Sequence, residues 1–232
     1  KSVKERSAIV RFKVVGEDAY FLAWTTTPWT LCSNIALCVN PDETYARVKA
    51  ADGFTYIMAK ALLDKVLGGI EREEGTPAYE IIEEYKGKDL EYKEYEPLYQ
   101  CAKDCADKQH KKAFFVYCDN YVTMEDGTGI VHIAPAFGED DSRLGRKYDL
   151  PYLQFVDGAG NMTEETEFAG VFIKKADPLI LDELKSRNQL FSAPKLEHEY
   201  PFCWRCDTPL IYYARESWFI KMSEVKDQLI KN

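Results

Sequence analysis

Apolar and polar residues alternate in short runs along most of the chain, which is the period of a β-strand with one buried face. These runs are rich in Val, Ile, Phe and Tyr, and Gly, Pro or Asp residues separate them. The predicted strands are residues 8–15, 20–26, 35–41, 44–50, 55–59, 113–122 and 129–135, with one or two more within 79–99. Short turns predict one hairpin between 8–15 and 20–26 and another between 35–41 and 44–50, and a further turn joins 113–122 to 129–135.

Three segments show helical spacing instead. Residues 60–68 end at a pair of glycines, and residues 140–149 begin with acidic side chains that suit the helix dipole. Residues 177–190 are amphipathic, with a proline near the start. Many short strands with few helices favour a mainly β fold, so we expect a closed or half-closed β-barrel with peripheral helices over residues 1–195. The aromatic-rich stretch 196–232 differs in character and is expected to be a separate segment.

The composition limits the class of protein. The chain has 232 residues, 46% of them hydrophobic, which suffices for one domain with a sizeable core and a small appendage. No run of about 18 apolar residues exists, so no membrane span is expected. The first residues also lack the apolar region of a secretion signal, and the charged ends are those expected of an excised fragment. The net charge of −9 argues against a protein that coats nucleic acid, but it permits contact with a short single-stranded end.

The chain contains seven cysteines. Without a secretion signal, we expect no disulfide framework and a reducing compartment, the cytoplasm. The thiols expected to be buried, because they lie in apolar strand-like runs, are those of Cys32, Cys38 and Cys118.

Cys203 and Cys206 form a Cys-x-x-Cys pair, the spacing of half of a four-thiolate zinc site. Such a site needs a second pair or added histidines. Cys101 and Cys105 have a less typical spacing, and His198 is a candidate third ligand. We therefore expect no complete zinc site in this chain; if the chain is a fragment, the second pair lies outside it.

The stretch WTTTPWT, residues 24–30, holds four threonines and two tryptophans. Three successive threonines on a strand alternate sides, so at least one hydroxyl faces inward, and a buried hydroxyl needs a partner. Two interpretations remain open from the spacing. One is a strand end whose hydroxyls bond to neighbouring backbone, and the other is a polar pocket floor that holds a small ligand or a water.

His132 lies in the apolar run GIVHIAP, and Asp141 follows nine residues later in GEDDSR. A lone histidine in a strand is more often structural, and an aspartate at a helix start is often a cap. The same stretch is also suited to bringing both side chains into one pocket, where a carboxylate holds a ligand ammonium. The sequence has no GxGxxG or GxxxxGK[ST] nucleotide cradle, no GxSxG elbow and no HExxH zinc motif.

Three stretches together carry a specific family resemblance. AWTTTPWTLCSNIALCVNP and DGTGIVHIAPAFGEDD closely resemble the two signature stretches of the editing domain of isoleucyl-tRNA synthetases, which are class I aminoacyl-tRNA synthetases. YPFCWRCDTPLIYYARESWFIKM resembles the segment by which that insertion returns to the catalytic domain, so the likeness runs from about residue 8 to 230. The related valyl and leucyl domains have an arginine and an acidic residue where Thr27 and Trp29 stand here. The ATP-binding motifs of the synthetase are absent.

The resemblance implies post-transfer editing, which is the hydrolysis of valine wrongly esterified to isoleucine tRNA. One methylene in a hydrophobic pocket is worth only about 1–3 kcal/mol, a range for which isoleucyl-tRNA synthetase is itself a standard example. A second pocket sorts the other way, because it admits the smaller side chain and excludes the larger one. The implied partners are the 3′ end of isoleucine tRNA, the valine moiety and the remaining domains of a parent synthetase. A monomer is expected, with no cofactor in the editing site and a structural zinc in the full-length enzyme.

The resemblance also implies roles for individual residues. Asp141 grips the α-ammonium of the substrate, His132 forms the wall that touches the amino-acid side chain and blocks isoleucine, and Trp24 supports the pocket from behind. A neutral threonine is a poor general base, so catalysis by positioning is expected, assisted by the free ribose hydroxyl. The hydroxyls implied to hold the terminal adenosine, the ester and the attacking water are those of Thr25, Thr26, Thr27 and Thr30.

Three other interpretations of the sequence remain. The chain is a free-standing deacylase acting in trans, or a folded module that binds RNA or peptide without catalysis, or a zinc-stapled structural domain. Substitution of Thr27 or Asp141 by alanine distinguishes catalysis from binding, because a binding module loses stability but no turnover.

Overall fold

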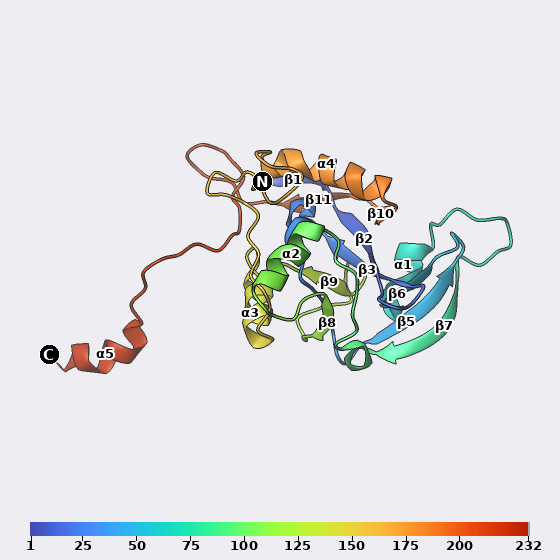
Figure 1. Cartoon of the computed structure of the whole chain (residues 1–232), viewed down its shortest axis with the longest axis horizontal. Coiled ribbons are helices and arrows are strands. Elements are labelled where there is room, and N and C mark those ends of the chain that lie inside the picture. Colours follow the sequence, from blue (N-terminus) through green and yellow to red (C-terminus); the bar gives the residue numbers. More distant parts are fainter. Residues whose placement is uncertain (232) are drawn as a thin grey trace.

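The computed structural model describes residues 1–231, apart from the side chain of His198. Figure 1 shows a strand-rich body with helices at its edges, from which the C-terminal segment extends. The strands are β1 (Ser2–Arg6), β2 (Ala8–Lys13), β3 (Tyr20–Thr25), β4 (Ala36–Val39), β5 (Thr44–Ala50), β6 (Thr55–Ala59), β7 (Tyr79–Lys86), β8 (Phe115–Cys118), β9 (Ile130–Ile133), β10 (Leu190–Ser192) and β11 (Lys195–Glu199).

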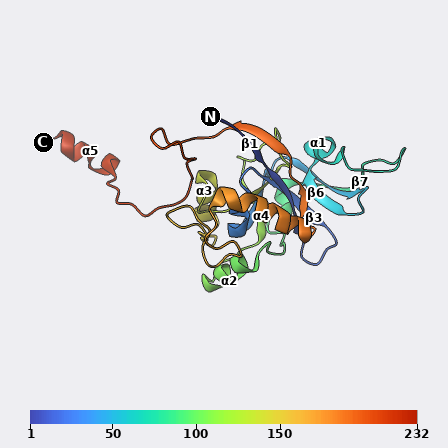
Figure 2. The ribbon, with the colours of Figure 1, turned by 90° about the horizontal axis from the view of Figure 1, so that it is seen from above.

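Short helices connect and cover these strands. The α-helices are α1 (Leu63–Leu67), α2 (Gln100–Lys108), α3 (Glu139–Lys147), α4 (Ile173–Ser186) and α5 (Met222–Ile230). The 3₁₀ helices are η1 (Pro28–Ser33), η2 (Lys60–Leu62) and η3 (Gly87–Leu90). Helix α4 packs against η1 and β10, and Figure 2 shows it crossing the strand-rich body. None of the helices in residues 1–231 has the length and apolar character needed to cross a membrane.

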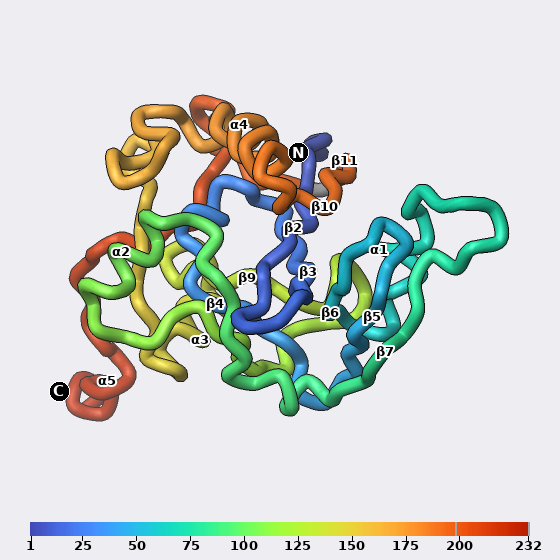
Figure 3. Tube along the Cα trace, turned by 45° about the vertical axis from the view of Figure 1, so that its right-hand side comes forward, coloured from blue at the N-terminus to red at the C-terminus, as the bar shows by residue number. Residues whose placement is uncertain are grey.

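Nine strands form one curled, mixed sheet, which confirms the predicted mainly β fold of half-barrel type. The order along the main path is β7-β5-β6-β3-β9-β4-β8, and β2 joins β3 to β10 beside this path. Figure 3 shows β5, β6 and β7 on one side of β2 and β3, with β4 and β9 on the other. Strands β1 and β11 form a separate pair that crosses the predicted boundary at residue 195. The division into two domains stays a prediction.

Strand β3 is the point at which the sheet divides. One edge pairs with β2 along its whole length, from Tyr20 to Thr25. The other edge pairs with β6 at Tyr20 and Phe21, and with β9 at Trp24. The first predicted hairpin, between β2 and β3, is therefore confirmed, and the end of β3 is brought beside β9.

The second predicted hairpin, between residues 35–41 and 44–50, is wrong. Strand β4 lies between β8 and β9, parallel to β8 and antiparallel to β9, whereas β5 pairs with β6 and β7. All four residues of β4 are buried, so this strand needs a partner on both edges and becomes a central strand of the sheet. Local turn residues carry no information about such non-local pairing.

Helix α4 begins four residues before the predicted start and contains Pro178 in its interior. Its buried face, Ile173, Ala176, Ile180 and Leu184, has helical spacing on both sides of the proline. Elements that the pattern did not predict include β1, α2, β10, β11, α5 and η1. Helix α2 was missed because polar and charged residues dominate its sequence, and only Ala102 and Ala106 are buried.

A buried hydrogen bond fixes the end of η1. The Asn34 side chain, which follows η1, donates to the Ala36 carbonyl oxygen over 2.9 Å and accepts from the Tyr95 hydroxyl over 2.7 Å. Both side chains are buried. This pair therefore joins η1 to the start of β4.

We expect the Tyr95→Phe substitution to lower the free energy of unfolding by about 1–3 kcal/mol, because it leaves the buried Asn34 Oδ1 atom without a donor. Tyr92→Phe is the matched control, since the Tyr92 ring is exposed, and its effect should stay below about 0.5 kcal/mol. Urea denaturation of both variants measures the difference. Equal losses would show that the Asn34 contact contributes nothing.

Candidate active site

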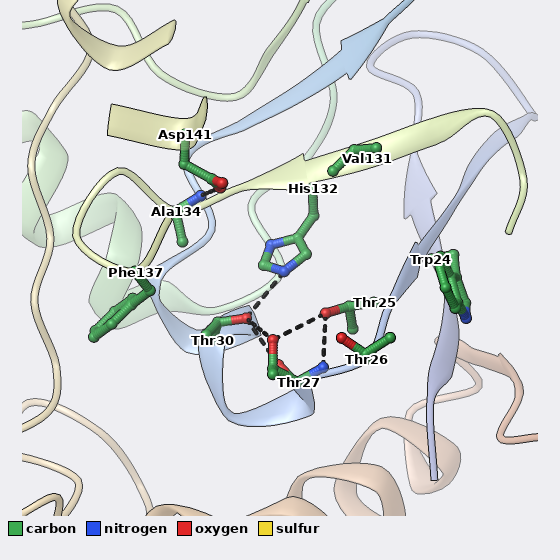
Figure 4. A pocket seen from close by; sticks show the side chains of 10 residues that line it. All are labelled: Trp24, Thr25, Thr26, Thr27, Thr30, Val131, His132, Ala134, Phe137 and Asp141. Atoms are coloured by element: carbon green, nitrogen blue, oxygen red, sulfur yellow. Dashed lines mark hydrogen bonds between the residues drawn. The ribbon is translucent and has the colours of Figure 1, made fainter. Parts of the chain in front are cut away.

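A pocket of about 230 Å³ lies where the end of β3 and η1 meet β9 and the start of α3. Figure 4 shows its side chains. The structure brings all seven residues proposed for the substrate site to this one pocket: Trp24, Thr25, Thr26, Thr27, Thr30, His132 and Asp141. Val131, Ala134 and Phe137 complete the lining. Sequence reasoning missed these three, because the apolar side chains within a signature stretch carry no chemical signal of their own.

The threonine hydroxyls form a connected array at the pocket floor (Figure 4). The Thr27 backbone N–H donates to Thr25 Oγ1 over 3.1 Å, and the Thr27 and Thr30 hydroxyl oxygens are 3.2 Å apart. The Thr30 hydroxyl donates to the Thr27 carbonyl oxygen over 2.8 Å. The two interpretations of the WTTTPWT stretch are thus compatible, because the same hydroxyls bond to backbone and line a pocket. The Thr26 hydroxyl has no hydrogen bond within residues 1–231, so its donor and acceptor capacity is unused.

The tautomer of His132 follows from this array. Its Nε2 atom lies 3.0 Å from Thr30 Oγ1. The single hydrogen of the Thr30 hydroxyl is already used on the Thr27 carbonyl, so Thr30 accepts and His132 Nε2 carries the proton. His132 Nδ1 is buried and has no partner among the described residues.

Burial keeps His132 neutral. The side chain is only 6% exposed, and removal from water lowers its pKa to about 4. The ring therefore carries no charge at neutral pH and presents a fixed, uncharged wall to the pocket. Its strand β9 pairs with β4, with His132 opposite Leu37, which holds the ring in place.

Asp141 lies opposite the hydroxyl array, with His132 between them (Figure 4). It occupies the first turn of α3, and its Oδ1 atom accepts the Ala134 N–H over 2.8 Å. A Cβ at Gly138 would lie 2.3 Å from Asp141 Oδ2, so a side chain there would displace the carboxylate. Burial raises the pKa of Asp141 to about 6, and the hydrogen bond from Ala134 opposes this shift.

The charge of the pocket selects for a cation. Among the described residues that line it, Asp141 is the only one that is charged at neutral pH, since His132 is neutral. No lysine or arginine contributes to the pKa of Asp141. A small ligand with an ammonium group next to a polar, hydrogen-bonding centre therefore matches both sides of the pocket.

Trp24 forms the outer wall. Gly127 has a φ of +71°, and a Cβ there would lie 2.7 Å from Trp24 Cε3, so the Gly127 backbone packs closely on the indole. This contact gives a physical reason for the glycine at position 127 of the DGTG turn. It agrees with the expectation that Trp24 supports the pocket, although the role of the ring stays a prediction.

The cysteine pair lies apart from this pocket. Cys203 and Cys206 occupy a turn closed by hydrogen bonds to Thr208, and neither lines the pocket. Within the described residues, no three His, Cys, Asp or Glu side chains gather as metal ligands, so Cys101 and Cys105 do not complete the site. The side chain of His198 lies outside the described part. Two thiolates fit half of a zinc site and no more.

Comparison with known proteins shows which solved structures share the fold and which family shares the sequence. No protein-family model matches the chain. A crystal structure described as GlLeuRS-CP1 has a TM-score of 0.63 and 17% identity, with 82% of this chain and 99% of that chain covered. The cytosolic leucyl-tRNA synthetase editing domain of P. knowlesi has a TM-score of 0.61 and 15% identity, with 82% and 96% covered. At such identities the likeness concerns the fold, which is that of the editing domains of aminoacyl-tRNA synthetases.

The sequence comparison is more particular. An isoleucine–tRNA ligase of Clostridium acetobutylicum is 49% identical over 234 residues, which cover all of this chain and 21% of that protein. The Pyrococcus abyssi isoleucine–tRNA ligase is 43% identical over 98% of this chain and 22% of its own length. The chain belongs to the isoleucine–tRNA ligase family and spans about a fifth of the length of these relatives. The resemblance seen in the sequence is confirmed.

The position of Asp141 predicts a cost in stability. Its pKa rises from 3.8 to about 6 on folding, so the folded chain binds more protons than the unfolded chain between these values. The contribution of Asp141 to stability therefore falls as the pH rises through this window, and the full penalty applies above pH 6. Two pKa units at about 1.4 kcal/mol each set an upper limit of about 3 kcal/mol.

We therefore expect Asp141→Asn to raise the free energy of unfolding at pH 7 by about 1–3 kcal/mol and to flatten its pH dependence between pH 4 and 6. Asp182→Asn, at an exposed position of α4, is the control and should change neither quantity. Denaturant titrations from pH 4 to 8 provide the measurement. A less stable Asp141→Asn chain at pH 7 would contradict the assignment.

Proposed function

We propose that the chain hydrolyses the ester bond of mischarged valyl-tRNA for isoleucine, as the post-transfer editing part of an isoleucyl-tRNA synthetase. The observation that carries the proposal is the arrangement of one pocket, in which a carboxylate and a hydroxyl array face each other across a neutral histidine. An aminoacyl ester has the matching pattern: an ammonium, a carbonyl and ribose hydroxyls within a few bonds.

Asp141 holds the substrate by its ammonium group. A charge-assisted hydrogen bond to a partly buried carboxylate is stronger than one in water, and the ammonium lowers the pKa of Asp141 back toward its usual range. The amino acid is thereby anchored by its backbone, so its side chain points to a fixed wall.

The threonines position water and the terminal ribose. The hydroxyl of Thr26 is unused within the described chain, and Thr27 and Thr30 are locked by their mutual bonds. Water attacks the ester carbonyl, and the tetrahedral intermediate expels the ribose oxygen, which takes up the proton lost by the water through the neighbouring ribose hydroxyl. Free amino acid and deacylated tRNA result. No side chain acts as a strong base, so the rate comes from positioning.

His132 acts as the sieve. The ring is held by Thr30 and by the sheet, so it cannot yield to an added methylene without loss of a buried hydrogen bond. Valine fits beside the ring, and isoleucine overlaps it. The pocket thus admits valine and excludes isoleucine, whereas a pocket built for isoleucine cannot strongly reject valine.

The partners follow from the charge and the fold. An acidic domain receives only the single-stranded 3′ end of isoleucine tRNA, while other domains of the synthetase supply most phosphate contacts. We propose that it works as a monomer in the cytoplasm. We also propose that Cys203 and Cys206 supply half of a structural zinc site, whose other ligands come from the parent enzyme.

Single-turnover deacylation tests the function. The chain in excess should hydrolyse the valyl ester of isoleucine tRNA and spare the isoleucyl ester, and Asp141→Ala should lower the valyl rate by at least about a hundredfold. Circular dichroism confirms that the variant is folded. A folded chain that neither hydrolyses the valyl ester nor binds a short valyl-adenosine amide would contradict the proposal, and an active Asp141→Ala variant would place the ammonium elsewhere.

His132→Ala should enlarge the pocket and allow hydrolysis of the correctly charged isoleucyl ester. We expect the ratio of valyl to isoleucyl rates to fall by about tenfold or more, the worth of one methylene. The same single-turnover assay measures both rates. If the ratio is unchanged while both esters are hydrolysed, His132 does not act as the wall.

A further inference from the structure

Asp177 of α4 contacts the back of the pocket rather than its interior. Its Oδ1 atom accepts the backbone N–H of Trp29 over 2.9 Å, across 148 residues of sequence. We propose that Asp177 is a positioning residue that holds η1, and with it the threonine array, in the geometry needed for hydrolysis. This inference rests on the proposed function and names a residue of the same site that no signature stretch contains.

The start of η1 needs such a contact. The first N–H groups of a helix have no partner within the helix. In the described structure Thr27, the residue before η1, provides no side-chain cap, and Pro28 has no N–H. The first free donor is therefore the N–H of Trp29, a residue whose side chain is 3% exposed. Asp177 satisfies this donor from a different element, so α4 completes a cap that η1 lacks.

The capped turn carries the chemistry of the pocket. Thr27 precedes it and Thr30 lies within it, and Thr30 bonds both to the Thr27 carbonyl oxygen and to His132 Nε2. The Trp29 ring packs edge-on against Phe137, another lining residue, with 4.9 Å between ring centres. A displacement of η1 would therefore move the hydroxyls of Thr27 and Thr30, the second of which is the partner of His132, and it would disturb the packing of Phe137.

One cation lies near Asp177, and it is paired with another carboxylate. Lys174 of the same helix forms an ion pair with Glu5 of β1 over 2.8 Å and lies over the Tyr200 ring, 4.4 Å from its centre. Burial raises the pKa of Asp177 to about 6, and the charge of Glu5 adds to this shift. Lys174 and the hydrogen bond from the Trp29 N–H act in the opposite direction and lower it. Asp177 does not line the substrate pocket, so it touches no substrate and acts through Trp29.

The geometry distinguishes two substitutions. Asp177→Ala removes the acceptor, whereas Asp177→Asn keeps an oxygen that can accept the Trp29 N–H. Asp182→Ala, at an exposed position of the same helix, is the matched control.

The first test is single-turnover hydrolysis of valyl-tRNA for isoleucine at increasing protein concentration. We expect Asp177→Ala to lower the saturating rate by about tenfold or more, because misplaced reacting groups cost rate. The half-saturating concentration should stay within about twofold, since Asp141 still holds the ammonium. Asp177→Asn should recover the rate to within about twofold of the parent, and Asp182→Ala should match the parent. An unchanged rate in Asp177→Ala, or an Asp177→Asn rate as low as that of Asp177→Ala, would overturn the proposal.

The second test does not depend on activity. The Nε2–H proton of His132 gives a nuclear magnetic resonance signal that reports its bond to Thr30. In Asp177→Ala this signal should shift or exchange rapidly with water, and in Asp177→Asn it should stay in place. A signal that is unchanged in Asp177→Ala would refute the positioning role. A parent chain that neither hydrolyses the valyl ester nor binds the valyl-adenosine amide would refute the proposed function alone, because the signal still decides whether Asp177 positions η1.

Discussion

The hydrogen bond between Thr30 and His132 joins the two halves of the site. The sheet divides at β3, and η1 leaves it there, so Thr27 and Thr30 lie outside the strand ladders that join β3 and β4 to β9. The 3.0 Å contact connects Thr30 to β9 inside the core. It also fixes the proton on Nε2, because Thr30 has already used its own hydrogen on the Thr27 carbonyl. The orientation of the ring and the order of the hydroxyls thus depend on one buried contact.

Asp141 and Asp177 both lie in surroundings that disfavour the charged form of a carboxyl group. Burial raises the pKa of both Asp141 and Asp177 to about 6, so each is retained at a cost to folding. Both accept a single backbone N–H at a turn that leads into the pocket, that of Ala134 and that of Trp29. Groups that reduce stability while fixing geometry are typical of functional sites.

The sequence predicted the strands better than their partners. Alternation located β2, β3, β5 and β6, but β4 was joined to the wrong neighbour because turn residues report only local pairing. The pocket residues were found because hydroxyl, imidazole and carboxylate groups stand out in two signature stretches. Phe137 and Asp177 were missed, since an aromatic in a loop and an aspartate in an amphipathic helix look ordinary until the fold brings them to η1.

The proposed function depends above all on Asp141, which binds an ammonium next to the hydroxyl array. Calorimetric titration with a non-hydrolysable valyl amide of adenosine, in buffers of different ionisation enthalpy at pH 6, measures the protons released on binding. Asp141 is about half protonated at this pH and must ionise to bind the ammonium, so we expect release of about half a proton. Binding without proton release would contradict this role of Asp141.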